Sequence, residues 1–199
     1  MQSIYNQIED RIRRMDRGAI LFPDDFTDIG SSEAVRIALM RLCKVGVVIR
    51  VAHGIYCYPK IDTQWVSGII QPSIEDIANA VAKRDKVRIM PTGAYVLNIL
   101  GLSTQVPANV VFVTDGSARR ISIGKGKGIL FKHTSEMRSF AFKSEMMMML
   151  VAALREIGQE NVTAEQIAIL KKHLQTISHE DYYHDIQLAP VWVRKTLAS

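Results

Sequence analysis

The apolar residues at the start of the chain recur with the spacing of a helix. They are Ile4, Ile8, Ile12 and Met15. Separations of four, four and three positions place them on one helical face, and Gly18 is suited to end the helix in a left-handed conformation. The apolar run AILF at 19–22 then predicts a short strand, and PDDFTDI at 23–29 predicts a short helix with Pro23 in its first turn.

A longer helix is predicted over SSEAVRIALMRLCKVG, residues 31–46. Ser31 or Ser32 is suited to cap its beginning and Gly46 to end it. Its apolar face is formed by Val35, Ala38, Leu39 and Leu42. The following segment VVIRVAHGIYCYP predicts two strands joined by a tight turn. The order helix, strand, short helix, turn, helix, hairpin is typical of a winged helix-turn-helix.

Residues 60–72 are predicted to connect two domains, with Trp65 anchoring the connection to a core. A capped helix is expected from Ser73 onward, and strands over KVRIM, NVVFVTD and the two arms of ARRISIGKGKGILFKHT. A helix over TGAYVLNILGL lies between the first two of these strands, and helices are predicted for the rest of the chain, with Ser144 and Thr163 as caps. We therefore expect an α+β protein, with an N-terminal winged helix-turn-helix at 1–62 and a mixed α/β domain with C-terminal helices at 72–199.

Composition agrees with a folded protein that has no membrane span. The chain is 48% hydrophobic and 23% charged, which is enough apolar content for a packed core. No run of about 18 uncharged apolar residues occurs, so no span is expected. Charges appear within the first residues, before any signal-peptide core, so we expect a cytoplasmic protein. The two cysteines, Cys43 and Cys57, lie in apolar segments and are interpreted as reduced packing residues.

The net charge of +5 is unevenly distributed along the chain. It is +1 over residues 1–70, +6 over 71–143 and −2 over 144–199. A basic balance favours anionic partners. The positive charge is therefore concentrated in the middle of the sequence.

The helix at 31–46 is the candidate recognition helix, and its outward residues are the candidate DNA contacts. Arg36 is expected to reach a guanine edge, whose O6 and N7 match its forked donors. The other candidates on or next to the helix are Ser31, Ser32, Met40 and Lys44, and the candidates in the hairpin are Arg50 and His53. Lys44 and the serine hydroxyls are expected at phosphates, which position the protein without specifying sequence. The alternative is a winged helix used only for protein contact.

A second candidate surface is the glycine-rich basic stretch between 119 and 132. Its cations are Arg119, Arg120, Lys125, Lys127 and Lys132. GKGKG does not match the phosphate-binding loop GxxxxGK[ST]. We expect a basic hairpin that contacts nucleic acid or an acidic protein surface, and a solvated turn without a partner is the third alternative.

Nothing in the sequence requires an enzyme, a metal or a cofactor. His179 and His184 are five positions apart in HEDYYH and miss the HExxH spacing of a zinc site. No serine lies in GxSxG, and neither cysteine has an evident activating partner. We expect no catalytic residues, no metal ligands and no cofactor.

The helix predicted over residues 31–46 and the hairpin that follows it resemble the N-terminal winged-helix domain of AbiEi-type antitoxins. The shared features are a helix that ends at a glycine and a wing that ends in glycine, an apolar residue, tyrosine and a nearby proline. Here these are Gly46, Gly54, Ile55, Tyr56 and Pro59. The helix around Gly93, NVVFVTDG and the basic hairpin are similar to the second domain of larger relatives. The resemblance covers nearly the whole chain, and its specific residues lie within 17–59.

The resemblance implies a type IV toxin-antitoxin system. Such antitoxins bind double-stranded DNA through the winged helix and repress their own operon. They also neutralise a nucleotidyltransferase-like toxin, so that toxin or its nucleic-acid target is the second expected partner, and no membrane is involved. The expected function is therefore that of a DNA-binding transcriptional regulator and antitoxin. The alternatives are a protein-interaction module without DNA binding, and a nucleic-acid-processing enzyme that uses the basic middle domain.

Overall fold

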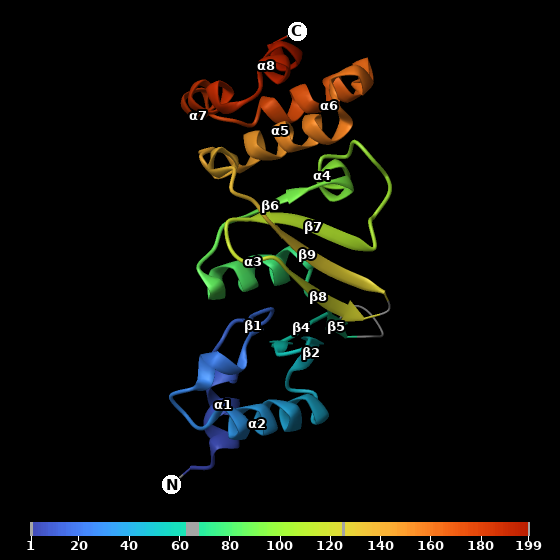
Figure 1. Cartoon of the computed structure of the whole chain (residues 1–199). Helices are drawn as coiled ribbons and strands as arrows, with labels where there is room; N and C mark the ends of the chain where they lie inside the picture. Colours follow the sequence, from blue (N-terminus) through green and yellow to red (C-terminus); the bar gives the residue numbers. More distant parts are fainter. Residues whose placement is uncertain (1, 63–67, 125, 199) are drawn as a thin grey trace. The chain divides into compact units, whose positions relative to one another are not determined.

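The computed structural model describes residues 2–62, 68–124 and 126–198 (Figure 1). Contacts divide the chain into two units, Met1–Val81 with Ile121–Gly124, and Ala82–Arg120 with Lys125–Ser199. This division runs inside helix α3 (Ile74–Asp85), whereas the boundary expected from the sequence lies at 62–72, before that helix. The fold class is α+β, as predicted.

The first unit contains its elements in the predicted order. They are α1 (Ile4–Arg13), β1 (Ile20–Leu21), the 3-10 helix η1 (Pro23–Phe26), α2 (Ser32–Lys44), β2 (Ile49–Ala52) and β3 (Ile55–Cys57). The strands form an antiparallel sheet in the order β1-β3-β2, in which Cys57 pairs with Ile20 on one side and Ile49 on the other. β3 therefore lies between the two outer strands.

Local chemistry explains why α2 begins and ends where it does. The hydroxyl of Ser31 accepts a hydrogen bond from the backbone N–H of Ala34, which satisfies one of the free donors of the first turn. At the other end Gly46 has φ +77°, a conformation that glycine adopts without a steric penalty. Between these ends Val35 and Leu39 are completely buried against Ile8 and Ile12 of α1 and their neighbours. The predicted apolar face of α2 is confirmed.

The segment at 60–72 contains more structure than the connection predicted from its sequence. β4 (Lys60–Ile61) and β5 (Ile69–Ile70) pair as an antiparallel hairpin. The backbone N–H of Asp62 also donates to the carbonyl of Gly68 at 2.8 Å. β-branched isoleucines favour extended pairing of this kind. The expected anchoring by Trp65 lies outside the described residues.

The sheet of the second unit mixes parallel and antiparallel strands. Its strands are β6 (Ile89–Thr92), β7 (Asn109–Thr114), β8 (Arg119–Gly124) and β9 (Lys127–His133), and the helix α4 (Ala94–Ile99) follows β6. The strand order is β6-β7-β9-β8, with β6 antiparallel and β9 parallel to β7. The division assigns Ile121–Gly124 of β8 to the first unit, although the strand is hydrogen-bonded into this sheet.

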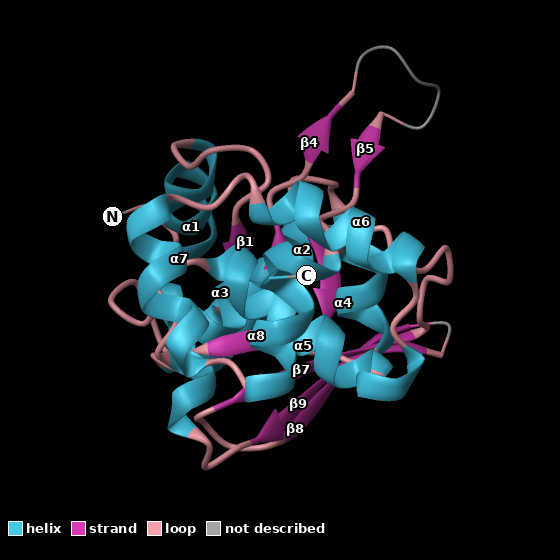
Figure 2. Cartoon of the chain, turned by 90° about the horizontal axis from the view of Figure 1, so that it is seen from above, coloured by secondary structure: helices cyan, strands magenta, loops and turns pink. Residues whose placement is uncertain are grey.

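Helices form the C-terminal part of the second unit, as predicted. They are η2 (Met137–Phe140), α5 (Glu145–Ile157), η3 (Gln159–Asn161), α6 (Ala164–Leu174), α7 (His179–Asp185), η4 (Ile186–Leu188) and α8 (Val191–Ala198). Ser144 caps α5, and Thr163 forms a capping box with Gln166 at α6. α5 lies beside α4 in both views (Figure 1 and Figure 2) and packs on β6. Met147 and Leu150 of α5 are completely buried in a core that also contains Met90 of β6. No described helix is long and apolar enough to cross a membrane.

Candidate functional site

The outward face of α2 carries two parallel rows of exposed side chains. Positions four apart on a helix lie one above the other. The first row is Arg36, Met40 and Lys44, and the second is Ile37, Arg41 and Val45. Met40 is 48% and Val45 65% exposed, whereas Leu42 on the inner face is completely buried. The helix is thus anchored by its inner face and presents cations and apolar side chains to solvent.

The cations of this α2 face make no ion pair with any described residue. The Nε of Arg36 donates to the carbonyl of Ser32 at 3.3 Å, and its two Nη groups have no hydrogen-bond partner among the described residues. Arg41 and Lys44 form no hydrogen bond or ion pair with the described part of the chain. Their charges are therefore available to an anionic partner.

Two acidic residues of the first unit pair with cations of α1. The guanidinium of Arg11 pairs with Asp28 at 2.6 Å, and its hydrogen bonds lower the pKa of that carboxyl. Arg13 pairs with Glu9 at 2.6 Å along α1. The acidic residue of α2 itself is Glu33, in the first turn, where the helix dipole stabilises a negative charge. The segment as a whole is therefore nearly neutral, although the α2 face is positive.

The two serines at the start of α2 differ in what they can contact. The hydroxyl of Ser31 is the N-cap and accepts from Ala34 at 3.3 Å. Ser32 is exposed, begins the helix and has no described side-chain hydrogen bond. A phosphate contact from this end of α2 would therefore come first from Ser32.

The β2–β3 hairpin offers one tethered cation and one exposed histidine. The Nε of Arg50 donates to the carbonyl of Ala52 at 3.3 Å, across an irregularity in the pairing of these strands. His53 is exposed at the turn, next to Gly54 with φ +69°. The turn is short, so His53 is its most projecting candidate contact.

The basic stretch at 119–132 forms the strands that the sequence predicts, but its cations do not share one surface. Successive side chains of a strand point to opposite faces, so Arg119 and Arg120 diverge. Arg119 forms an ion pair with Asp85 and lies over the ring of Phe131 at 5.4 Å. Arg120 instead donates to Asn109 Oδ1 at 2.8 Å. Lys127 and Lys132 are exposed, and Lys125 lies outside the described residues.

A polar cluster lies where β7 ends. Asp115 accepts from the backbone N–H of Arg88 at 2.8 Å and from its Nε at 2.9 Å, and these bonds hold the pKa of Asp115 below its usual value. The hydroxyl of Thr114 donates to the Arg88 carbonyl at 2.9 Å and accepts from the N–H of Gly116 at 3.0 Å. His133, at the end of the parallel strand β9, has its Nδ1 2.9 Å from the Gly116 carbonyl. These bonds fix the loop after β7 in one conformation.

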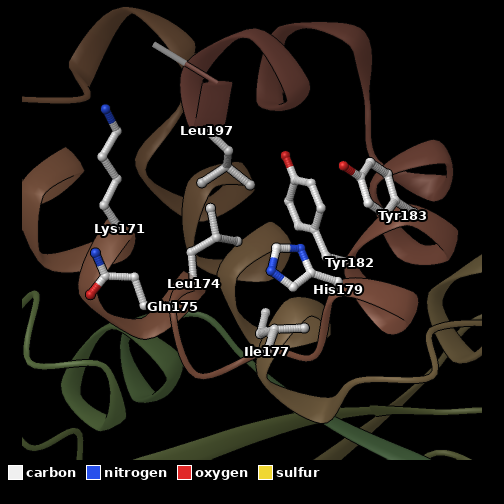
Figure 3. Close-up of a pocket in the computed structure, with 8 residues that line it drawn as sticks. All are labelled: Lys171, Leu174, Gln175, Ile177, His179, Tyr182, Tyr183 and Leu197. Atoms are coloured by element: carbon white, nitrogen blue, oxygen red, sulfur yellow. The ribbon is translucent and has the colours of Figure 1, made fainter.

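A hollow lies among the C-terminal helices (Figure 3). It has a volume of about 480 Å³, and side chains of α6, α7 and α8 line it. The rings of His179 and Tyr183 are stacked at 6.5 Å, and Tyr183 is 65% exposed. His184, in contrast, has its Nδ1 2.7 Å from the completely buried carboxylate of Asp185. The two histidines of HEDYYH thus have different surroundings, and no described group of His, Cys, Asp or Glu could hold a metal ion.

Comparisons with known proteins establish a family. Residues 7–182 match the model of a family of unknown function, DUF6088. The chain belongs to this family. Its fold is similar to the crystal structure of the RV2827C protein from Mycobacterium tuberculosis, with a TM-score of 0.51 and 13% sequence identity over 100% of this chain and 82% of that one. No curated protein matches the sequence.

The structure thus brings together one of the two predicted surfaces. The candidates of α2 lie along one helix face, and they are joined there by Arg41, which the sequence analysis did not select. Its position four residues after the exposed Ile37 was a usable signal, because positions four apart lie on the same side of a helix. Of the candidates of the basic stretch, Arg119 and Arg120 lie on opposite faces of β8, and Lys127 and Lys132 lie on β9.

Proposed function

We propose that this protein is a DNA-binding transcriptional regulator that reads the major groove with α2. The observation that carries the proposal is the α2 face, on which three cations lie outward without an ion partner among the described residues. An isolated helix face of this kind can approach an anionic surface without first breaking protein contacts. Protein cations without partners are available to replace the counterions that surround DNA.

The arrangement of the first unit supports a winged helix-turn-helix. A helix, a short strand, a short helix, α2 and a hairpin follow in order, and the sheet order is β1-β3-β2. In helix-turn-helix proteins the helix after the turn enters the major groove. α2 has 13 residues, so it is about 20 Å long, and the major groove, about 12 Å wide, admits a helix.

The chemistry of the α2 face assigns a role to each residue. Arg36 is proposed to bind a guanine edge with its two Nη groups. Arg41 and Lys44 are proposed to bind phosphates, which fix the position of the helix on the duplex. Met40 supplies an exposed apolar surface suited to a thymine methyl group.

The resemblance to AbiEi-type antitoxins extends this proposal. It adds repression of the protein's own operon and neutralisation of a nucleotidyltransferase-like toxin, with the second unit as the antitoxin part. The α2 face supports DNA binding alone. Autorepression and toxin neutralisation stay predictions of the resemblance, and so does a cytoplasmic location.

The salt dependence of DNA binding by the full chain tests the proposal. Affinity for the DNA upstream of its own gene should fall linearly with salt on a logarithmic plot, with a slope of about −0.9 per phosphate contact. Replacing Arg41 and Lys44 by Gln removes two contacts, so the slope should become less steep by about 2. The matched control is Lys171→Gln with Lys172→Gln on α6, which changes the charge equally and should leave the slope unchanged.

The possible outcomes separate the alternatives. Binding that does not respond to salt would contradict the proposal. A folded α2 variant with the wild-type slope would move the phosphate contacts to another surface. A chain that binds no DNA and still captures a partner protein would favour the protein-interaction alternative, and turnover of a nucleic acid would favour the enzyme.

A further inference from the structure

A small cavity beside the end of β7 has the features of a ligand site. Its volume is about 320 Å³, and all its lining residues belong to the second unit. They are Asp85, Val87, Thr114, Gly116, Ser117, Arg119 and Phe131. Ligand sites of this size combine apolar walls with a few polar groups. Here Val87 and Phe131 are the walls, and a guanidinium, a carboxylate and hydroxyls are the polar groups.

Three charged side chains meet beside the cavity. Asp85 pairs with Arg119 through Oδ2 and with Arg84 through Oδ1, the latter at 2.8 Å. One carboxylate thus faces two guanidinium groups, and all three side chains are between 25% and 35% exposed. Burial, together with the neighbouring Arg84, lowers the pKa of Arg119. A second anion beside Arg119 would favour the charged form of this guanidinium in a partly desolvated site.

Arg119 also has unused donors. Its Nη2 donates to Asp85, and the described residues offer no hydrogen-bond acceptor to its Nε or Nη1. The stack against Phe131 holds the guanidinium plane in place. The hydroxyl of Ser117 has no described partner, whereas that of Thr114 is already satisfied. A forked donor and a free hydroxyl therefore line the same cavity.

The backbone beside this cavity is constrained at two positions. Lys86 has φ +56°, a left-handed conformation that is costly for a residue other than glycine. Here it ends α3, with the N–H of Val87 donating to the Ala82 carbonyl at 3.0 Å. The turn places Asp85 and Val87 on the cavity. A Cβ on Gly116 would come within 2.5 Å of Val87, so a larger residue there would displace the wall.

We propose that this cavity binds a small organic anion, in which a carboxylate or phosphate group meets Arg119 and Ser117 and an apolar or aromatic part lies against Val87 and Phe131. A guanidinium fork matches both kinds of anion in geometry. Such a ligand would make the protein a regulator that senses a metabolite. The site is independent of the α2 face, so it can be present whether or not α2 binds DNA.

Nuclear magnetic resonance titration of the full chain tests the site. The probes are phenyl phosphate and benzoate, with inorganic phosphate as the ion that lacks an apolar part. We expect saturable shifts of the amide signals of Gly116 and Ser117 and of the side-chain Nε–H of Arg119. Phenyl phosphate or benzoate should bind more tightly than inorganic phosphate, because only they can reach the apolar walls.

Three variants make the result specific. Arg119→Gln should weaken binding on the order of tenfold, the effect of losing a charge-assisted hydrogen bond. Arg120→Gln is the matched control, because it removes the same charge from the opposite face of the same strand and should leave binding unchanged. Ser117→Ala, at an exposed position that does not threaten the fold, should weaken binding several-fold.

Several results would overturn the proposal. These are the absence of saturable shifts in the wild-type protein, equal loss in Arg119→Gln and Arg120→Gln, or inorganic phosphate binding as tightly as both organic probes. If a short DNA duplex shifts the cavity signals and the organic probes do not, the cavity holds a nucleic-acid phosphate and the proposal is wrong. Substitution of the α2 cations should leave probe binding unchanged, so failure of the DNA-binding proposal would be seen separately.

Discussion

Replacing Asp185 tests how the C-terminal helices are joined to the rest of the second unit. Its carboxylate is completely buried, and it accepts from the backbone N–H of Lys143 and of Ser144, each at 2.8 Å. These two donors lie just before α5, where the helix dipole also stabilises a negative charge. Asp185→Ala would leave both N–H groups without an acceptor inside the protein. Because a hydrogen bond to a charged group contributes about 1.5–3 kcal/mol, we expect a loss of about 3–5 kcal/mol in the free energy of unfolding.

Urea unfolding followed by circular dichroism measures this loss. Asp185→Asn keeps the shape and one acceptor oxygen, so it should lose less than Asp185→Ala. Glu180→Ala is the control, because Glu180 also contacts Lys143, but through the side-chain ammonium at 3.3 Å and from a position that is 85% exposed. An exposed pair of this kind contributes less than about 1 kcal/mol. A loss below about 1 kcal/mol in Asp185→Ala, or equal losses in the Asp185 and Glu180 variants, would refute the reasoning.

Three further predictions concern single groups. Lys86→Gly should raise the free energy of unfolding by about 1 kcal/mol, because glycine adopts the left-handed conformation of this residue without strain; a lower urea midpoint would contradict this. The lowered pKa of Asp115 stabilises the fold at any pH above the usual aspartate pKa of about 4, and this contribution is lost as the pH falls through the lower pKa of the folded state. The free energy of unfolding should therefore decrease less between about pH 4 and pH 2 in Arg88→Ala than in the wild-type protein. The same decrease in both proteins would show that the Arg88 side chain and Asp115 contribute nothing as a pair. Burial raises the pKa of Cys57 to about 11, so iodoacetamide at pH 8 should label Cys57 only after unfolding, and rapid labelling of Cys57 in the native protein would exclude its burial.

Local sequence signals were sufficient to predict most elements. Ser31, Ser144 and Thr163 each cap the helix that the sequence assigns to them, because a side-chain cap acts within three residues. The glycines that end α2 and α5 are also local signals. The hairpin at 60–70 was missed because its strands have two residues each, too few to show an alternating pattern.

The candidate sites were only partly accessible to sequence reasoning. The α2 face follows from helical spacing, and the same reasoning would have added Arg41. The opposite orientations of Arg119 and Arg120 also follow from strand alternation. The partners of these arginines could not be predicted from the sequence. Asp85 lies 34 positions before Arg119, and pairing over such a distance is decided by the tertiary fold. The cavity beside β7 depends on that pairing.

Binding of the full chain to specific and random DNA, compared between two triple variants, tests the central claim most directly. One variant replaces Arg36, Arg41 and Lys44 of α2 by Gln, and the other replaces Arg120, Lys127 and Lys132 of the basic stretch by Gln. Both remove three positive charges, so a general electrostatic effect is the same in each.

The account predicts that the α2 variant loses its preference for the specific site. Arg36→Ala alone should cost about 1–3 kcal/mol on that site and little on random DNA. The second variant should keep the preference, and any loss of its affinity should be equal on both DNAs. Retained preference in the α2 variant, with lost preference in the second variant, would show that the second unit reads the sequence and that α2 does not.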